Sequence, residues 1–114
     1  MSKESIKKIW DLKKGKFYSV NKPIDIDITS EKGWIFIESD GCNVCVIGNT
    51  YKEAFEHFFF DIIYFYEHYK NMSENNLCGD ALKWKEYYDN LLTEISEEEI
   101  DKENELYKLF EEDV

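Results

Sequence analysis

The residues that follow Thr50 constrain the fold most, because they form a long apolar run with helical spacing. Thr50 and Glu53 form a capping box, in which the Thr hydroxyl accepts the third helical amide and the Glu side chain reaches back. Apolar side chains then cover more than half of the helix circumference. The sequence predicts a helix over residues 50–70 that is buried on two sides. Its two apolar rows are Ala54, Phe58, Ile62, Phe65 and Tyr69, and Phe55, Phe59, Ile63 and Tyr66.

Three short runs before this helix have the two-residue period of half-buried strands. The first is Ile24–Thr29, the second Trp34–Glu38 and the third Cys42–Ile47, with turn signals at residues 31–33 and at Asp40-Gly41. Because the loops are short, these strands are expected to form an antiparallel meander. Phe17–Val20 is a fourth strand candidate, and it ends at residues 21–23. Residues 5–12 fit either a strand or a short helix, and the helical spacing fits slightly better.

Two more helices are predicted after the long one. The first runs from about residue 79 to 95, with its apolar side chains facing inward. Ser96 and Glu99 form a second capping box, which restarts a helix that carries Ile100 and Phe110. The expected fold is therefore one α+β domain over residues 1–114. A three- to four-stranded antiparallel sheet packs on helix 50–70, and the two C-terminal helices cover the other side of that helix.

The chain is strongly acidic, with a formal net charge of −11, and all 14 basic residues are Lys. The absence of Arg removes the side chain best suited to bidentate phosphate binding. Direct nucleic-acid binding is therefore not expected, since it requires a basic surface. The charge is uneven along the chain. Residues 1–16 hold six Lys and two acids, whereas residues 94–114 hold ten acids and two Lys.

The acidic C-terminal segment provides the candidate partner-binding residues Glu94, Glu98, Asp101 and Glu105. Their spacing of four, three and four places them on one face of the predicted helix, about 5–6 Å apart. Such a row resembles the charge pattern of a nucleic acid and fits a groove lined with basic side chains. The alternative interpretation is a solubilising surface on an acidic protein.

The cysteines and histidines give weaker evidence for a functional site than the acidic segment does. Cys42 and Cys45 form a C-x-x-C pair that, with Cys78 and a His, has the ligand types of a zinc site, and the pair alone is also a redox motif. In a strand, however, residues three apart point to opposite faces. His57 and His68 lie about 16 Å apart along the predicted helix and cannot share a proton or an ion. We therefore expect structural cysteines, surface histidines, no metal and no cofactor.

The remaining polar positions give no catalytic motif. Asp25, Asp27 and Glu38 lie on the polar faces of the predicted strands, where a solvated surface is the expected role. The chain contains no Gly-rich phosphate loop. It also lacks a leader and any apolar run long enough to span a membrane, so a cytoplasmic location with no membrane contact is expected.

Several aromatic residues exceed what the predicted core needs. Tyr51, Phe60, Tyr64 and Tyr87 are either absorbed by a large aromatic core or exposed at an interface. An exposed set would serve a protein partner or a homodimer.

Residues 46–55, from Val46 through Gly48, Thr50 and Glu53 to Phe55, resemble the strand–G-x-T-x-x-E-A–helix junction of HicB-like antitoxins. The resemblance covers residues 24–70 at most. It implies a small sheet packed on a helix and neutralisation of a toxin partner. The two C-terminal helices and the absence of a DNA-binding tail depart from that family. The short, acidic, Arg-free profile is also similar to that of phage anti-defence proteins such as anti-CRISPRs.

These observations lead to a functional hypothesis. The protein is expected to be a non-catalytic inhibitor that occupies the basic surface of a nucleic-acid-processing protein, such as a nuclease or effector. The alternative is a HicB-like antitoxin that buries an aromatic face against a small basic toxin. A third, catalytic hypothesis would depend on His57, Cys42 or Cys45.

Overall fold

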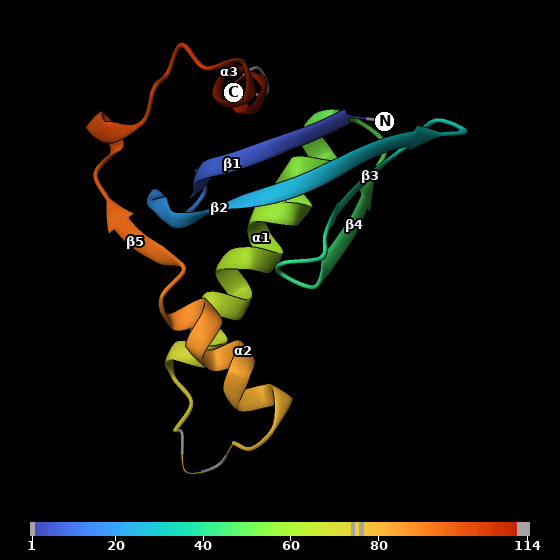
Figure 1. The fold of residues 1–114 in the computed structure, drawn as a ribbon. Helices are drawn as coiled ribbons and strands as arrows, with labels where there is room; N and C mark the ends of the chain where they lie inside the picture. The colour runs from blue at the N-terminus through green and yellow to red at the C-terminus, as the bar shows by residue number, and fades with distance from the viewer. Residues whose placement is uncertain (1, 74, 76, 112–114) are drawn as a thin grey trace.

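The computed structural model describes residues 2–73, 75 and 77–111. In Figure 1 the sheet forms one layer and the long helix runs across one of its faces. The predicted α+β class is confirmed, with an antiparallel sheet, a long helix and two shorter helices after it. The elements in chain order are β1 (Ser2–Asp11), β2 (Lys16–Glu31), β3 (Trp34–Ser39), β4 (Val44–Gly48), α1 (Tyr51–Lys70), α2 (Asp80–Asp89), β5 (Leu92–Ile95), η2 (Glu97–Glu99) and α3 (Glu105–Glu111).

The long strand β2 organises the sheet. β1 pairs antiparallel with β2 along one of its edges. The opposite edge of β2 is divided, because β5 pairs with Phe17–Val20 and β3 pairs with Asp27–Glu31. β4 completes the sheet beside β3. The result is the order β1–β2–β3–β4, with β5 added to the end of β2 that β3 does not reach.

The first 31 residues differ from the sequence prediction in two ways. Residues 5–12 belong to strand β1, so the helical interpretation is wrong, and β2 continues through residues 21–23 where a break was expected. Both differences follow from one irregularity: Ile6 lies opposite Ile24, but Lys8 lies opposite Ser19. The shift allows Ile6 and Ile9, three residues apart, to be buried together. Pro23 lies in this irregular stretch, where its missing N–H is tolerated.

The two predicted turns are confirmed. Lys32 and Gly33 connect β2 to β3 with φ angles of 51° and 83°. Positive φ at both central positions matches the right-handed twist of a hairpin, and glycine adopts it without strain. The β3–β4 turn begins at Asp40, whose carbonyl accepts a hydrogen bond from the Asn43 N–H at 3.2 Å.

Helix α1 begins where the capping residue predicts. The Thr50 hydroxyl accepts the backbone N–H of Glu53 at 3.0 Å. The chain turns tightly from β4 into the helix at Gly48, where an added Cβ would lie 2.5 Å from the backbone nitrogen of Ala54. Six side chains then bury α1 on the sheet: Ala54, Phe55, Phe58, Phe59, Ile62 and Ile63.

The prediction that α1 is buried on two sides is only partly correct. α2 packs on the C-terminal half of α1, where the rings of Tyr69 and Tyr88 stack at 5.6 Å. Farther toward its N-terminus, α1 keeps a face in solvent, since Phe60 is 59% exposed and Tyr64 is 53% exposed.

The helix predicted over residues 79–95 is too long. α2 ends at Asp89, and Leu92–Ile95 form strand β5 on the edge of β2. Leu91 and Leu92 are both buried there. The open edge of β2 offers backbone partners and core contacts that a continued helix could not use, so tertiary pairing overrides helix propensity.

The last described helix returns to the first strand. Tyr107 and Phe110 of α3 pack edge-on against the ring of Trp10, at 5.2 and 5.4 Å. Phe59 of α1 joins the same cluster. Figure 1 shows α3 beside β1, so the first strand and the last described helix meet over one aromatic cluster.

Candidate functional site

The four predicted partner-binding residues do not lie on one helix. Glu94 is in β5, Glu98 is in the one-turn 3₁₀ helix η2, Asp101 is in the following loop, and Glu105 begins α3. The predicted row with helical spacing is therefore wrong. Ser96 does form a capping box with Glu99, but the turn ends at Ile100, whose backbone is extended and whose side chain is buried.

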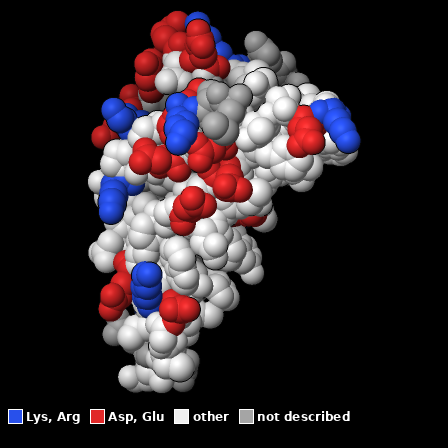
Figure 2. Space-filling view, turned by 45° about the vertical axis from the view of Figure 1, so that its right-hand side comes forward, with Lys and Arg blue, Asp and Glu red and all other residues white. Residues whose placement is uncertain are grey.

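All four side chains are nevertheless exposed on one continuous acidic strap, which we define as residues 94–105. Buried residues on the strap and on either side of it, Leu92, Ile100 and Tyr107, fasten it to the core. The strap thus presents its carboxylates from a backbone that is fixed at several points. In Figure 2 the acidic side chains gather on the upper half of the visible face, while most of the lower half is uncharged.

The basic start of the chain lies against this acidic strap. Lys16 forms an ion pair with Glu94 at 3.6 Å, and the ammonium of Lys8 donates a hydrogen bond to the backbone carbonyl of Glu99. Within the strap itself, Lys102 pairs with Glu97 at 3.2 Å. These contacts are exposed, so each contributes little to stability. The Lys side chains neutralise only part of the negative charge of the strap.

Local hydrogen bonds act on the protonation of Glu98. Its own backbone N–H and the Ser96 hydroxyl lower the pKa of the Glu98 carboxyl, and Lys102 acts in the same direction. The Glu98 carboxylate therefore stays ionised to a lower pH than an ordinary Glu side chain.

A second acidic region lies on the sheet face that points away from α1. Asp27 of β2 is directly opposite Glu38 of β3, and Lys3 of β1 approaches Asp27 at 3.8 Å. Like charges in directly opposed positions disfavour strand pairing. The solvated role predicted for Asp25, Asp27 and Glu38 agrees with their exposed or half-exposed positions.

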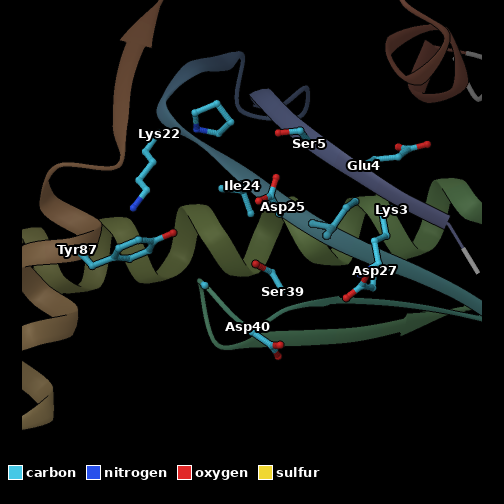
Figure 3. A pocket seen from close by; sticks show the side chains of 13 residues that line it. Lys3, Glu4, Ser5, Lys22, Ile24, Asp25, Asp27, Ser39, Asp40 and Tyr87 are labelled. Atoms are coloured by element: carbon cyan, nitrogen blue, oxygen red, sulfur yellow. The ribbon is translucent and has the colours of Figure 1, made fainter.

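The divided edge of β2 leaves an open stretch between β3 and β5. Among the described residues, no strand pairs with Lys22–Ile26 on that edge. A hollow of about 770 Å³ adjoins it and extends across β2, bounded by residues 3–5 of β1, by the β3–β4 turn and by Tyr87 of α2. Figure 3 shows Lys22 and Tyr87 at one end of this hollow and the turn at Asp40 along its side. Sequence reasoning missed this feature, for which Pro23 within a strand was the available signal.

The cysteines have structural positions. Cys42 is buried in the β3–β4 turn and Cys45 is exposed in β4, so the strand predicted to start at Cys42 begins only at Val44. The Cys42 thiol lies 3.1 Å from the Tyr87 hydroxyl, and the Tyr88 hydroxyl donates to the Cys42 carbonyl at 2.7 Å. Burial raises the pKa of Cys42, so its thiol is less reactive. In residues 2–73, 75 and 77–111, no group of three His, Cys, Asp or Glu side chains could hold a metal ion.

The histidines lie on the exposed side of α1. His57 Nδ1 is 2.8 Å from the carbonyl oxygen of Ile47, so the imidazole covers part of the edge of strand β4. His68 stacks on Tyr64 at 5.8 Å, and Tyr64 stacks on Phe60 at 6.3 Å. These last three residues form what we call the aromatic ridge, a row with four-residue spacing along α1. Of the other aromatics considered from sequence, Tyr51 is exposed and Tyr87 is half-buried.

No protein-family model, curated protein or solved structure matches this chain. The segment that resembles HicB-like antitoxins forms the end of β4, the turn at Gly48 and the first turn of α1. Gly48 allows a close approach to Ala54, and Thr50 caps the helix. These two local roles account for the pattern without any shared function, so the resemblance to HicB-like antitoxins remains a hypothesis about function. None of the helices in the described part of the chain is long and apolar enough to cross a bilayer.

Proposed function

We propose that the protein is a non-catalytic acidic binding protein, which inhibits a nucleic-acid-processing protein by occupying that partner's basic surface. A phage-encoded anti-CRISPR or another anti-defence inhibitor is the kind of protein that we have in mind. The observation that carries the proposal is the exposure of every acidic side chain on the strap. These side chains are Glu94, Glu97, Glu98, Glu99, Asp101, Glu103 and Glu105.

The strap suits this role because its backbone is already ordered. Pairing of β5 with β2 fixes its start, Ile100 anchors its middle, and Tyr107 packs on the core just beyond its end. A fixed array of carboxylates does not lose backbone entropy on binding, so more of the electrostatic attraction appears as affinity. The high negative charge would also speed the encounter with a basic partner.

The test is affinity capture from a lysate of the native host, followed by identification of the bound protein by mass spectrometry. We expect capture of a nucleic-acid-processing protein, release by raised salt, and loss of that protein's nucleic-acid binding when this protein is added. The variant Glu98→Lys, Asp101→Lys and Glu105→Lys should capture at least about tenfold less, because each change replaces attraction with repulsion.

A matched control carries the same change of charge away from the strap. Glu31→Lys, Glu67→Lys and Glu86→Lys alter three exposed side chains of β2, α1 and α2. This control should capture the partner within about twofold of the unmodified protein after correction for net charge. If both triple variants capture equally less of the partner, binding depends on the overall negative charge of the protein and not on the strap. If neither variant captures less, the proposal is rejected.

The aromatic ridge favours a second candidate function, an antitoxin-type protein that neutralises a small basic toxin. Phe60 and Tyr64 are more than half exposed in the middle of a long helix. Large exposed aromatics of this kind are enriched in protein interfaces. In that case a gene for a small basic protein should lie adjacent, and Tyr64→Ala should abolish capture while raised salt should not.

A further inference from the structure

We propose that the open stretch of β2, residues 22–26, binds a short extended segment of a partner chain that carries Lys or Arg side chains. The segment would add a strand to β2 in the space between β3 and β5. This inference deepens the proposed function, because it names a form in which a basic partner could be bound. It depends on a different part of the molecule from the acidic strap.

The backbone of β2 supports strand addition at this place. On the edge that β3 and β5 share, β5 begins with Leu92 opposite Val20, and the pairing of β3 ends with Glu38 opposite Asp27. Alternate residues of an antiparallel strand direct their N–H and C=O groups to a given edge. Between Ile24 and Ile26, therefore, at least one residue presents an edge pair to the hollow. Other proteins bind extended peptides through strand edges of this kind.

The hollow has room for a short peptide segment. Its volume of about 770 Å³ lies in the range of small-ligand sites. One wall is the β3–β4 turn at Ser39, Asp40 and Gly41, and the end wall is Tyr87. Ser39 and Cys42 are buried and hydrogen-bonded to each other, and Cys42 also contacts Tyr87. The walls are thus tied together before any segment binds.

The charges around the hollow select a basic occupant. Its carboxylates are Glu4, Asp25, Asp27 and Asp40, whereas its ammonium groups are Lys3 and Lys22. Lys3 already approaches Asp27 at 3.8 Å. Ile24 and Ile26 are buried under the strand, so the side chain of Asp25 points to the opposite, exposed face. A Lys or Arg side chain on an added strand would meet that carboxylate across the pair.

The test uses the hexapeptide acetyl-Thr-Lys-Val-Lys-Val-Thr-amide, titrated into isotopically labelled protein and followed by two-dimensional NMR. We expect amide shifts at Ile24–Ile26, at residues 39–41 and at Tyr87. N-methylation of the central Lys and Val should weaken binding at least about tenfold, because it removes ladder donors without changing the charge. Asp25→Lys should weaken it similarly.

Glu31→Lys is the matched control, because it makes the same charge change on an exposed residue of β2 outside the hollow. It should leave affinity for the peptide within about twofold. Gly41→Leu should block binding by filling the hollow, since a Cβ at Gly41 meets only the Ser39 hydroxyl, at 4.0 Å. Preserved spectra elsewhere would show that each variant is folded.

Three results would overturn the inference: no binding, shifts confined to the strap or to the aromatic ridge, or affinity indifferent to N-methylation and to Asp25→Lys. None of them bears on the triple reversal at Glu98, Asp101 and Glu105, which tests the proposed function separately. Conversely, loss of lysate capture in that triple variant with peptide binding intact would separate the two surfaces.

Discussion

Residues 24–70 and residues 80–111 follow the same local rules of patterning and capping, yet only the first region folds as those rules predict. In residues 24–70 the alternating strands, the two turns and the capped helix all agree with the packing around them. In residues 80–111 the local patterns favour two long helices, but the chain forms α2, β5, η2 and α3. Local preference decides structure where tertiary contacts support it, and it yields where they do not.

Truncation of one core ring in each region gives the largest expected contrast. Phe58 is fully buried in the middle of α1, so Phe58→Ala should reduce the free energy of unfolding by about 4 kcal/mol. Phe110 is buried at the end of the short helix α3, which can detach without opening the sheet. Phe110→Ala should cost about half as much, with local fraying of α3. Urea denaturation and amide hydrogen exchange would measure both, and equal losses would contradict a difference between the regions.

A change at the strand–helix junction should have the next largest effect. A Cβ on Gly48 would lie 2.5 Å from the backbone nitrogen of Ala54, and no flexible side chain can move to relieve it. Gly48→Ala should therefore destabilise the protein by about 2–3 kcal/mol. Gly41→Ala is the control, because a Cβ there meets nothing closer than 4.0 Å. Thermal unfolding of the two variants should differ clearly, and similar midpoints would contradict the close packing at Gly48.

Substitution of the capping residue in each region allows a direct comparison of their stability losses. Thr50 caps a helix of 20 residues, and Thr50→Ala should cost about 1 kcal/mol. Ser96 caps a single exposed 3₁₀ turn, so Ser96→Ala should cost at most about 0.5 kcal/mol. Chemical denaturation would resolve this difference. A larger loss for Ser96→Ala would show that the strap is more strongly coupled to the core than its contacts indicate.

At neutral pH the smallest expected effect is that of Tyr18 of β2, which lies opposite Glu94 of β5 at the seam between the regions and acts through a pH dependence. Burial, followed by the carboxylates of Glu67 and Glu94, raises the pKa of Tyr18 to about 12 from 10.0. The folded state therefore keeps a proton that the unfolded state releases, and stability falls as pH rises from about 10 towards 12. Tyr18→Phe should flatten that decline in urea denaturation. An unchanged slope in Tyr18→Phe would contradict this role.

Much of the fold could be predicted from sequence because its signals are local. The period of Ile24, Ile26 and Ile28 predicts a strand, and Thr50 marks the start of α1 within one residue. The irregularity between β1 and β2 lets β2 continue through residues 21–23 and buries both Ile6 and Ile9. It could not be predicted, since it depends on the register between two strands. β5 was missed for the same reason, because Leu92–Ile95 becomes a strand only beside the free edge of β2.

The candidate site was predicted in composition but not in geometry. The acidic residues Glu94, Glu98, Asp101 and Glu105 are exposed, as a binding role requires, but they follow an irregular strap and not a helix. The exposure of Phe60 and Tyr64 was one of two alternatives that sequence left open. Pro23 was a local signal for an unpaired edge, but the extent of the open edge at residues 22–26 depends on where β3 and β5 stop pairing with β2, which no local motif encodes.

The central claim is that the protein binds a basic partner through the carboxylates of its strap. The most direct measurement is the salt dependence of affinity between the captured partner and two proteins, the unmodified chain and the variant Glu98→Lys, Asp101→Lys and Glu105→Lys. We expect affinity for the unmodified chain to fall steeply between low and physiological salt. The variant should bind at least about tenfold more weakly and with a shallower dependence on salt. An affinity that is the same for both proteins and indifferent to salt would contradict the claim.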